Sequence, residues 1–379
     1  MDEDKISQFP NEILQHILSF IDIHEAVETT ILSKRWKHLW RSLLCIRLHI
    51  HGGAAYRHRV SQFLSHRDAA AAVHDFHLSL DIKTNLDTAF VEECVLYAIN
   101  HNVQSLRLQI LRHYEPFLGL PAPLLVSETL LELEIRQVHF RGIYLPRRFS
   151  LPNLKTLCLE RLWLFDDHRS REDVVEPFAG LPELEKLYLC EFPITDLVLR
   201  APKLRVLEIV QYSFQNMEVA KEISAPLLTS FRYEGHLPLE CSKMNLPMLE
   251  KVHLDIHHVS NHVKGMHLNC VRMLQQLGKA TVVSLTLDTL KVLELDGGPI
   301  EQSHSPFRNL KCLKLVEGRR KIRTVLQSVM NYLTVGTLYF ESMMVEFPDD
   351  VVVVEQNSEY MSDEEDTDYT WGFDNLFRN

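Results

Sequence analysis

The sequence predicts an α/β fold in which three short amphipathic helices lead into an irregular solenoid of leucine-containing repeats, followed by an acidic tail. Three observations support this fold class. Apolar residues recur every three or four positions before residue 45, a Leu-x-x-Leu-x-Leu pattern returns from Val103 onward, and acidic residues gather after Glu346. We therefore divide the chain into a helical head (1–45), a connection with an N-terminal capping repeat (46–102), a solenoid (103–347) and a disordered tail (348–379).

The helical head carries more apolar surface than it can bury by itself. Its first helix is expected to have one apolar stripe, formed by Ile13, Leu14, Ile17, Leu18 and Ile21. Asp22, with Glu25 three residues later, can form a capping box at the start of the second helix. Domains shorter than about 40 residues usually need a metal, a disulfide or a partner, and no cysteine or metal cluster lies between Asp4 and Trp40. The repeats or another protein must therefore cover this surface.

Regular pattern returns after a stretch at 52–67 that we interpret as a connection. Alternating apolar residues predict a strand at 73–82, and an apolar stripe predicts a helix at 90–99. The ten repeats that follow are Val103-Leu106-Leu108, Leu130-Leu133-Ile135, Leu154-Leu157-Leu159, Leu184-Leu187-Leu189, Leu204-Leu207-Ile209, Leu228-Phe231-Tyr233, Leu249-Val252-Leu254, Val282-Leu285-Leu287, Leu310-Leu313-Leu315 and Val335-Leu338-Phe340. Two further segments, at 263–277 and 290–295, are expected to be helical.

Each Leu-x-Leu segment is expected to be a short strand whose leucines point into the solenoid, because side chains alternate between faces along a strand. The residue between the leucines then faces the concave surface. From repeat to repeat these residues form a ladder: Arg107, Glu134, Cys158, Tyr188, Glu208, Arg232, His253, Thr286, Lys314 and Tyr339. Its mixture of both charges with aromatic rings suits a protein partner better than a phosphate. The alternative is an ordinary solvated sheet face without a partner.

Composition and charge exclude several classes of function. The 379 residues are 46% hydrophobic and 24% charged, as is usual for a globular protein. From Glu346 to the end, eleven acidic residues against Arg378 alone give −10 of the total charge of −11, so the rest of the chain lacks the net positive charge of a nucleic-acid-binding domain. No signal peptide or membrane span is recognisable, and the seven cysteines are scattered. We expect a cytoplasmic or nuclear protein with reduced cysteines and without nucleic-acid or membrane partners.

No motif for catalysis, a cofactor or a metal is found. The chain lacks a Gly-x-Ser-x-Gly elbow, a phosphate-binding glycine loop and a His-Glu-x-x-His helix. The densest histidine group consists of His257, His258, His262 and His267, for which surface histidine is the favoured interpretation and a metal site the alternative. The basic run Arg319-Arg320-Lys321 with Arg323 suits a solvated turn, and nuclear import is the alternative.

The head contains a specific set of short motifs: Asp4-Lys5-Ile6-Ser7, Phe9-Pro10, Ile13-Leu14, Ile17-Leu18-Ser19-Phe20, Glu25-Ala26-Val27, Ile31-Leu32-Ser33-Lys34-Arg35-Trp36 and Leu39-Trp40. In these motifs it resembles the F-box family. The resemblance implies docking on a Skp-type adaptor and, through it, on a cullin ubiquitin ligase. The implied adaptor contacts are Phe9, Pro10, Ile13, Ile17, Leu18, Val27, Leu32 and Trp36. Phe9 departs from the family, which usually has leucine before the proline. The alternative is that these side chains form only an internal core.

The repeats also resemble those of plant F-box proteins with leucine-rich repeats, of the FBD-associated type, at Ala201-Pro202-Lys203-Leu204, Ala225-Pro226-Leu227-Leu228 and 306–311. Members often continue into a further C-terminal region, whereas here Pro348 leads to four valines and acidic sequence. The resemblance implies a non-catalytic substrate-recognition subunit of an SCF-type (Skp-cullin-F-box) ubiquitin ligase. A target protein would bind the ladder residues Arg107, Glu134, Tyr188, Glu208, Arg232, His253, Lys314 and Tyr339. The alternatives are a receptor whose small-molecule signal joins the target to the repeats, and a scaffold outside any ligase.

Overall fold

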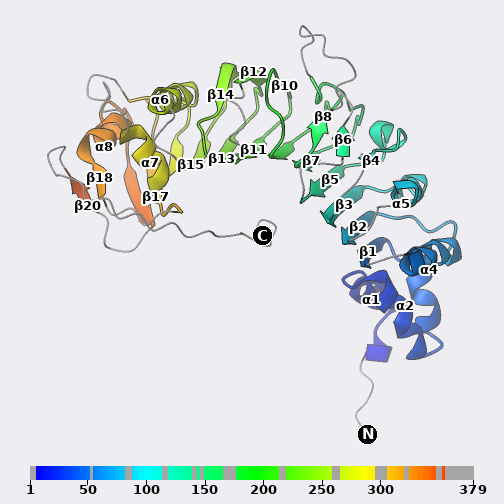
Figure 1. The fold of residues 1–379 in the computed structure, drawn as a ribbon. Coiled ribbons are helices and arrows are strands. Elements are labelled where there is room, and N and C mark those ends of the chain that lie inside the picture. The colour runs from blue at the N-terminus through cyan, green and yellow to red at the C-terminus, as the bar shows by residue number, and fades with distance from the viewer. Residues whose placement is uncertain are drawn as a thin grey trace.

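The structure of the 379-residue chain is a computed structural model. It describes residues 6–51, 54–81, 88–112, 118–138, 143–145, 149–164, 176–212, 219–257, 265–294, 305–319, 324–346 and 352–354. A small helical head lies at one end of an arc-shaped solenoid, and a long sheet lines the inner side of the arc (Figure 1). The predicted order, a helical head followed by an α/β repeat array, is confirmed.

Three short helices form the head, as predicted. They are α1 (Asn11–Leu18), α2 (Ile23–Glu28) and α3 (Trp36–Leu39), with 3₁₀ turns at Ile6–Gln8, Thr29–Ile31 and Trp40–Ser42. Asp22 caps α2, because its Oδ1 accepts the His24 N–H at 2.7 Å. Isolated helices this short are marginal in water. The head therefore depends on tertiary packing, and Leu14 and Leu18 are buried in the same core as the first strands of the sheet.

One parallel sheet of 12 strands runs through the whole described solenoid. Its strands, in spatial order, are β1 (Cys45–His51), β2 (Asp75–Asp81), β3 (Ser105–Arg112), β5 (Glu132–Gln137), β7 (Thr156–Glu160), β9 (Lys186–Cys190), β11 (Val206–Gln211), β13 (Ser230–Gly235), β15 (Lys251–Ile256), β16 (Val282–Thr286), β17 (Cys312–Val316) and β19 (Ser342–Glu346). Because spatial order follows chain order, each strand pairs only with the strands of neighbouring repeats, as in other solenoids.

Return segments of several kinds connect these strands (Figure 1). The helices are α4 (Ala54–His66), α5 (Thr88–Asn100), α6 (Met266–Gln276), α7 (Leu287–Glu294) and α8 (Gln327–Thr334), with a 3₁₀ turn at Leu124–Val126. Three small parallel sheets complete the connections: β4 (Leu118–Gly119) with β6 (Ile143–Leu145) and β8 (Trp163–Leu164), β10 (Val198–Arg200) with β12 (Val219–Ser224) and β14 (Glu240–Asn245), and β18 (Thr324–Leu326) with β20 (Val352–Val354).

The repeat leucines form the core between the long sheet and the return segments. In β9, for example, Leu187 and Leu189 are at most 1% exposed, while Tyr188 between them is only half-buried. Fully burying such a side chain stabilises the fold by about 1.5–3 kcal/mol. The Leu-x-Leu interpretation is therefore confirmed for most repeats. The helices expected at 90–99, 263–277 and 290–295 appear as α5, α6 and α7, the last ending at Glu294.

The stretch interpreted as a connection at 52–67 links strands β1 and β2 through a helix that was not predicted. Residues 54–66 form helix α4, and Cys45–His51 before it form strand β1. The sheet therefore begins at residue 45, the last residue of the predicted head. Ile46, Leu48 and Ile50 alternate at period two, but they lack the Leu-x-x-Leu frame that marked the later strands. At the other end, β20 pairs with β18, so regular structure extends into the predicted tail. Residues after 354 lie outside the described part.

Two predicted repeats have the wrong register. In Val282-Leu285-Leu287, the buried strand residues are Val283 and Leu285, because Leu287 already begins α7. In Val335-Leu338-Phe340, Val335 is instead the C-cap residue that follows α8. The strand starts at Ser342, whose N–H donates to Lys311 O at 3.1 Å. Alternating apolar residues were available in more than one frame, and the backbone hydrogen bonds between neighbouring strands decided between them.

Candidate functional site

The head exposes many large apolar side chains. Among the expected adaptor contacts, the four that are between 43% and 63% exposed are Phe9, Ile13, Ile17 and Leu32. Pro10 is exposed as well, and Val27 is partly buried against the core. Ile6, Phe20, Ile31 and Leu44 are further exposed apolar residues of the head. Soluble monomers seldom leave such a cluster in water unless a partner or a ligand covers it.

Leu18 and Trp36, two further expected adaptor contacts, are buried inside the protein. They are 2% and 5% exposed and belong to the internal core, so for these two residues the structure favours the internal-core alternative over direct adaptor contact. Amphipathic spacing could not separate them from Ile13 and Ile17, because a short helix with apolar residues on two neighbouring faces gives one broad stripe.

Polar contacts fix the head to the first repeat. Arg35 donates its Nε–H to Asn11 Oδ1 at 2.8 Å and a second N–H to Phe9 O, which holds the start of α1 against α3. Asp22 Oδ2 accepts the backbone N–H of His49 in β1 at 2.7 Å. One carboxylate therefore caps a head helix and also binds the first strand, so the orientation of the head relative to the solenoid is defined.

In-register strand pairing places most of the predicted ladder residues in one row. Arg107, Glu134, Cys158 and Tyr188 lie opposite one another on successive strands. The row continues without a shift through Glu208, Arg232 and His253. The complete concave ladder is Arg47, His77, Arg107, Glu134, Cys158, Tyr188, Glu208, Arg232, His253, Ser284, Lys314 and Met344. Its role in binding a target stays a prediction.

Two predicted ladder residues do not belong to this row. Ser284 stands where Thr286 was expected, and Thr286 is buried with its hydroxyl donating to Asp255 Oδ1 at 2.9 Å. Met344 stands where Tyr339 was expected. Tyr339 is exposed and precedes β19, so it lies outside the sheet. Arg47 and His77, which the sequence had placed before the repeats, extend the row at its other end.

The centre of the ladder holds desolvated polar groups. Burial, with a contribution from the charge of Glu234, raises the pKa of Glu208 even though Arg232 opposes the shift. Burial and the charge of Glu208 likewise raise the pKa of Tyr188. Burial lowers the pKa of His253, and the charge of Arg232 adds to this. These shifts all disfavour the charged forms, and depletion of charge is typical of the centre of a protein interface.

Comparison with known proteins identifies the head. An F-box domain matches residues 6–48. An F-box/LRR-repeat protein of Arabidopsis thaliana is 27% identical over 342 residues, which cover 87% of this chain and 69% of that protein. The chain is an F-box domain protein related to plant F-box/LRR-repeat proteins. A putative F-box/LRR-repeat protein of the same plant is 25% identical over 375 residues, or 90% of this chain and 72% of the relative.

An FBD-type relative is also present. A putative F-box/FBD/LRR-repeat protein of Arabidopsis thaliana is 27% identical over 259 residues, which cover 65% of this F-box protein and 56% of the relative. The chain spans between 52% and 72% of the lengths of four such relatives, so each relative extends beyond the matched part.

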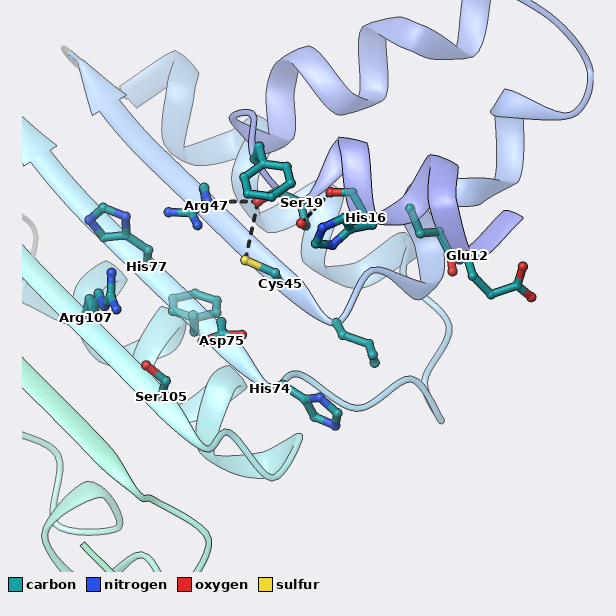
Figure 2. A pocket seen from close by; sticks show the side chains of 14 residues that line it. Glu12, His16, Ser19, Cys45, Arg47, His74, Asp75, His77, Ser105 and Arg107 are labelled. Carbon is teal, nitrogen blue, oxygen red and sulfur yellow. Dashed lines mark hydrogen bonds between the residues drawn. The ribbon is translucent and has the colours of Figure 1, made fainter. Parts of the chain in front are cut away.

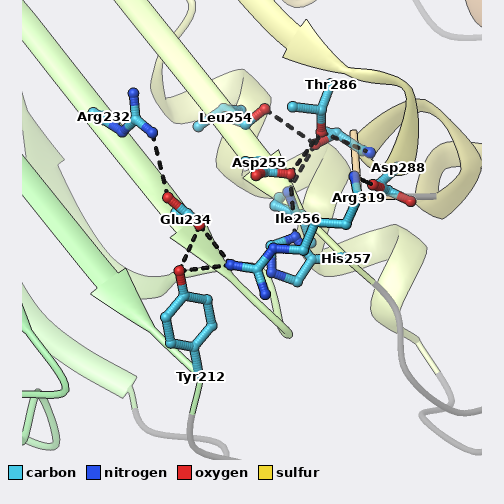
Figure 3. Close-up of polar contacts among 11 residues, drawn as sticks. Tyr212, Arg232, Glu234, Leu254, Asp255, Ile256, His257, Thr286, Asp288 and Arg319 are labelled. Carbon is cyan, nitrogen blue, oxygen red and sulfur yellow. Dashed lines mark hydrogen bonds and ion pairs between the residues drawn. The ribbon is translucent and has the colours of Figure 1, made fainter. Parts of the chain in front are cut away.

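The F-box protein also contains a polar cluster that sequence reasoning missed (Figure 3). Tyr212 Oη donates to Glu234 Oε1 at 2.5 Å. Arg319 Nη2 donates both to Tyr212 Oη and to Glu234 Oε1, each at 2.7 Å. The Arg319 guanidinium also lies 4.7 Å from the centre of the Tyr212 ring. Burial opposes ionisation of Glu234, but the hydrogen bonds from Tyr212 and Arg319 and the charge of Arg232 outweigh it and lower its pKa.

A close backbone approach positions Arg319. Its N–H donates to Asp288 Oδ2 at 2.6 Å, and a Cβ atom on Gly318 would lie 2.0 Å from that same oxygen. Arg319 was predicted to lie in a solvated basic run, whereas it joins the loop after β17 to strands β11 and β13. Arg320, Lys321 and Arg323 lie outside the described residues. No local sequence signal announced the contact, because 85 and 107 residues separate Arg319 from Glu234 and Tyr212.

Two of the four histidines in the predicted group lie in the described part of the chain, and both are buried. His257 is buried, with Nδ1 3.1 Å from Asp255 Oδ1, and His267 is buried in α6, so the surface interpretation is wrong for both. His258 and His262 lie outside the described part. Within the described ranges, no group of three or more His, Cys, Asp or Glu side chains could hold a metal ion. None of the described helices is long and apolar enough to cross a membrane.

Proposed function

We propose that this F-box protein is the substrate-recognition subunit of an SCF-type ubiquitin ligase. In this proposal the head binds a Skp-type adaptor and through it a cullin, the concave ladder binds a target protein, and the attached ligase transfers ubiquitin to the target. The chain itself contributes binding and no catalytic group, and it would act in the cytoplasm or the nucleus.

The observation that carries the proposal is the division of apolar residues in the head. Leu14, Leu18 and Trp36 are buried, whereas Ile13 and Ile17 on the same or adjoining helices remain exposed. Packing inside the protein explains why Leu14, Leu18 and Trp36 are apolar. It does not explain Ile13 and Ile17, which no other described residue buries. A match to the F-box domain over the same residues supports an adaptor as that cover.

Adaptor binding tests this assignment directly. Replacing Ile13 and Ile17 with alanine should weaken binding of a purified Skp-type adaptor by about 2 kcal/mol or more, because large buried anchors dominate interface energy. Isothermal titration calorimetry measures the affinity. The melting temperature should change little, because both side chains are already exposed in the free protein.

The matched control replaces Leu227 and Met248, which are exposed apolar residues of the solenoid, with alanine. This variant should bind the adaptor as the wild type does. Equal affinity of the Ile13/Ile17 variant and the wild type would refute the proposed adaptor surface.

Target recognition is expected at the middle of the concave ladder. Tyr188 and Arg232 lie on β9 and β13, with Glu208 on β11 between them. Aromatic and arginine side chains near the centre of an interface carry most of its energy. Replacing Tyr188 and Arg232 with alanine should reduce the ubiquitinated proteins that co-purify with the chain when the proteasome is blocked, while adaptor binding persists. An unchanged set of captured proteins would place recognition elsewhere on the molecule.

A further inference from the structure

A groove of about 480 Å³ lies between the head and the first three strands (Figure 2). One wall is a side of α1 that carries Glu12, Gln15 and His16, and the floor is the concave face of β1, β2 and β3. The exposed residues Ile13 and Ile17 lie on the same helix but do not line this groove. The groove is therefore distinct from the proposed adaptor surface, although both use α1.

The floor of the groove presents two guanidinium groups in one row. Arg47, His77 and Arg107 lie opposite one another on β1, β2 and β3. Arg47 lines the groove and donates its Nε–H to the carbonyl of Ser19 at 2.8 Å (Figure 2). Arg107 is 3.6 Å from Glu134 Oε2, a loose contact. Among the described residues, neither arginine has a bidentate carboxylate partner.

Carboxylates lie near the two arginines: Glu12 and Asp75 line the groove, and Glu134 is opposite Arg107 on β5. Burial and then the charges of His49, Arg47 and Arg107 lower the pKa of His77 to about 4, so His77 is neutral at physiological pH and adds hydrogen-bonding capacity without charge. Asp75 is two residues earlier on β2, between Cys45 and Ser105, and Glu12 is on α1. Asp75 and Glu12 lie apart from the arginine row, whereas Glu134 is the next residue of that row beyond Arg107. Arg47 and Arg107, with neutral His77 between them, can each bind one anionic group of a ligand.

The spacing of the row selects a peptide conformation. Neighbouring strands are about 4.8 Å apart, so Arg47 and Arg107, two strands apart, are separated by about 10 Å along the row. A polyproline II segment rises about 3.1 Å per residue with three residues per turn, so every third side chain returns to the same side after about 9 Å. Two acidic side chains three residues apart therefore match the two arginines.

Apolar surface continues from the arginine row toward the head. Phe20 follows Ser19, whose carbonyl binds Arg47, and it is 65% exposed while lining the groove. Leu44 lines the groove as well and is also exposed. A peptide that crosses β3, β2 and β1 in that order reaches Ser19 and Phe20 of the head next, so an apolar residue at one end of its acidic pair would be buried against Phe20.

We propose that the groove binds an extended acidic segment of the target protein, with two Asp or Glu residues three positions apart and an apolar residue on the head side. This inference rests on the proposed function, since it describes how that same target is held. It places one end of the target beside the adaptor-binding head, whereas the remainder lies along the concave ladder.

Synthetic fluorescent peptides of about twelve residues test the spacing. They carry two glutamates two, three or four positions apart in a proline-rich background, with one leucine at one end. Fluorescence anisotropy with the full-length chain should give an affinity at least about fivefold higher for the three-residue spacing than for the others, falling as salt is raised. Equal affinities for the three spacings would overturn the proposal.

Charge reversal tests the site. Arg107→Glu, which removes no contact between head and sheet, should weaken the best peptide at least about tenfold. Lys251→Glu is the matched control, because it makes the same charge change on an exposed concave residue of β15 and should leave binding unchanged. Equal losses in both variants would show non-specific charge attraction and overturn the site.

Two further measurements identify the occupant of the groove and separate it from adaptor binding. A full-length variant with Asp363, Glu364, Glu365 and Asp366 changed to their amides should bind the peptide as the wild type does. Tighter binding would identify the chain's own tail as the occupant and overturn the assignment to a target. Adaptor affinity, measured on every variant, should stay constant. If the wild-type chain did not bind the adaptor, the proposed function would be refuted, and the result of the peptide experiment would still stand.

Discussion

The buried surroundings of His236 should make the free energy of unfolding depend on pH. It follows β13 and lies 5.1 Å from His257 and 5.5 Å from Tyr212 between ring centres. Burial, and then the charge of His257, lowers its pKa to about 4, although a backbone hydrogen bond with His257 opposes the shift and Arg319 adds to it. An unfolded histidine has a pKa near 6.5. Between these values the unfolded chain binds more protons than the folded chain.

The free energy of unfolding should therefore carry a contribution from His236 that is complete above about pH 6.5 and is lost as the pH falls toward 4. His236→Gln removes this titration. Urea unfolding at a series of pH values should show a smaller decrease between pH 6.5 and 4 for the variant than for the wild type. His38→Gln, at an exposed position of α3, is the control and should retain the wild-type slope. Parallel curves for His236→Gln and the wild type would contradict the prediction.

At the scale of elements, the loop after β17 acts as a strap across the solenoid. Its Arg319 reaches the ends of β11 and β13, so strands four and three places away along the sheet are joined by one side chain. Replacing Arg319 with alanine removes charge-assisted hydrogen bonds to a partly buried carboxylate, and we expect a loss of about 1 kcal/mol in the free energy of unfolding. Urea unfolding measures it.

The strap can be separated from general loss of charge by a double-mutant cycle. Arg319→Ala combined with Glu234→Gln should cost less than the sum of the two single substitutions, because the pair interacts directly. Lys203, which pairs with Glu183 on the exposed surface, provides the comparison and should show coupling near zero when both partners are replaced. Strict additivity at Arg319 and Glu234 would show that the strap contributes no stability.

The sequence could predict the helices and strands that depend on a pattern within a few neighbouring residues. The paired leucines predicted most strands of the sheet, and the ladder row followed from period two. Strand β1 was missed because Ile46, Leu48 and Ile50 lack the repeat frame, and Thr286 was placed wrongly because two apolar frames overlapped. In the head, the motif spacing located the apolar residues but did not distinguish Ile17, which is exposed, from Leu18, which is buried. The contacts of Arg319 could not be predicted, because they depend on the stacking of five strands, from β11 to β17.

For the whole molecule, the head and the solenoid share one core. Buried residues from Leu14 in α1 to Leu333 in α8 belong to a single cluster, and the matched F-box region, 6–48, ends inside strand β1. A fragment of residues 1–48 would therefore keep part of a strand without the neighbour with which it pairs. We expect this fragment to show no cooperative thermal transition by circular dichroism, whereas the full-length chain does.

Adaptor added to the fragment supplies the control. If the exposed apolar residues are the adaptor surface, binding should restore helical signal to the fragment, because a partner that binds only the folded form stabilises it. A fragment that melts cooperatively by itself would show that the head is an independent domain and that the shared core is unnecessary for its stability.

The two ends of the sheet differ in what covers them. The head packs against β1, but β19 has no neighbour beyond it in the described part, and Leu338, Met343 and Met344 around it are at least 47% exposed. An additional repeat stacked there would bury apolar surface that is already present and would leave the opposite end untouched. The array can therefore vary in length without altering the head, and several relatives are substantially longer than their matched part. Under the proposed function, evolution could change the extent of the concave ladder while the adaptor-binding head stays constant.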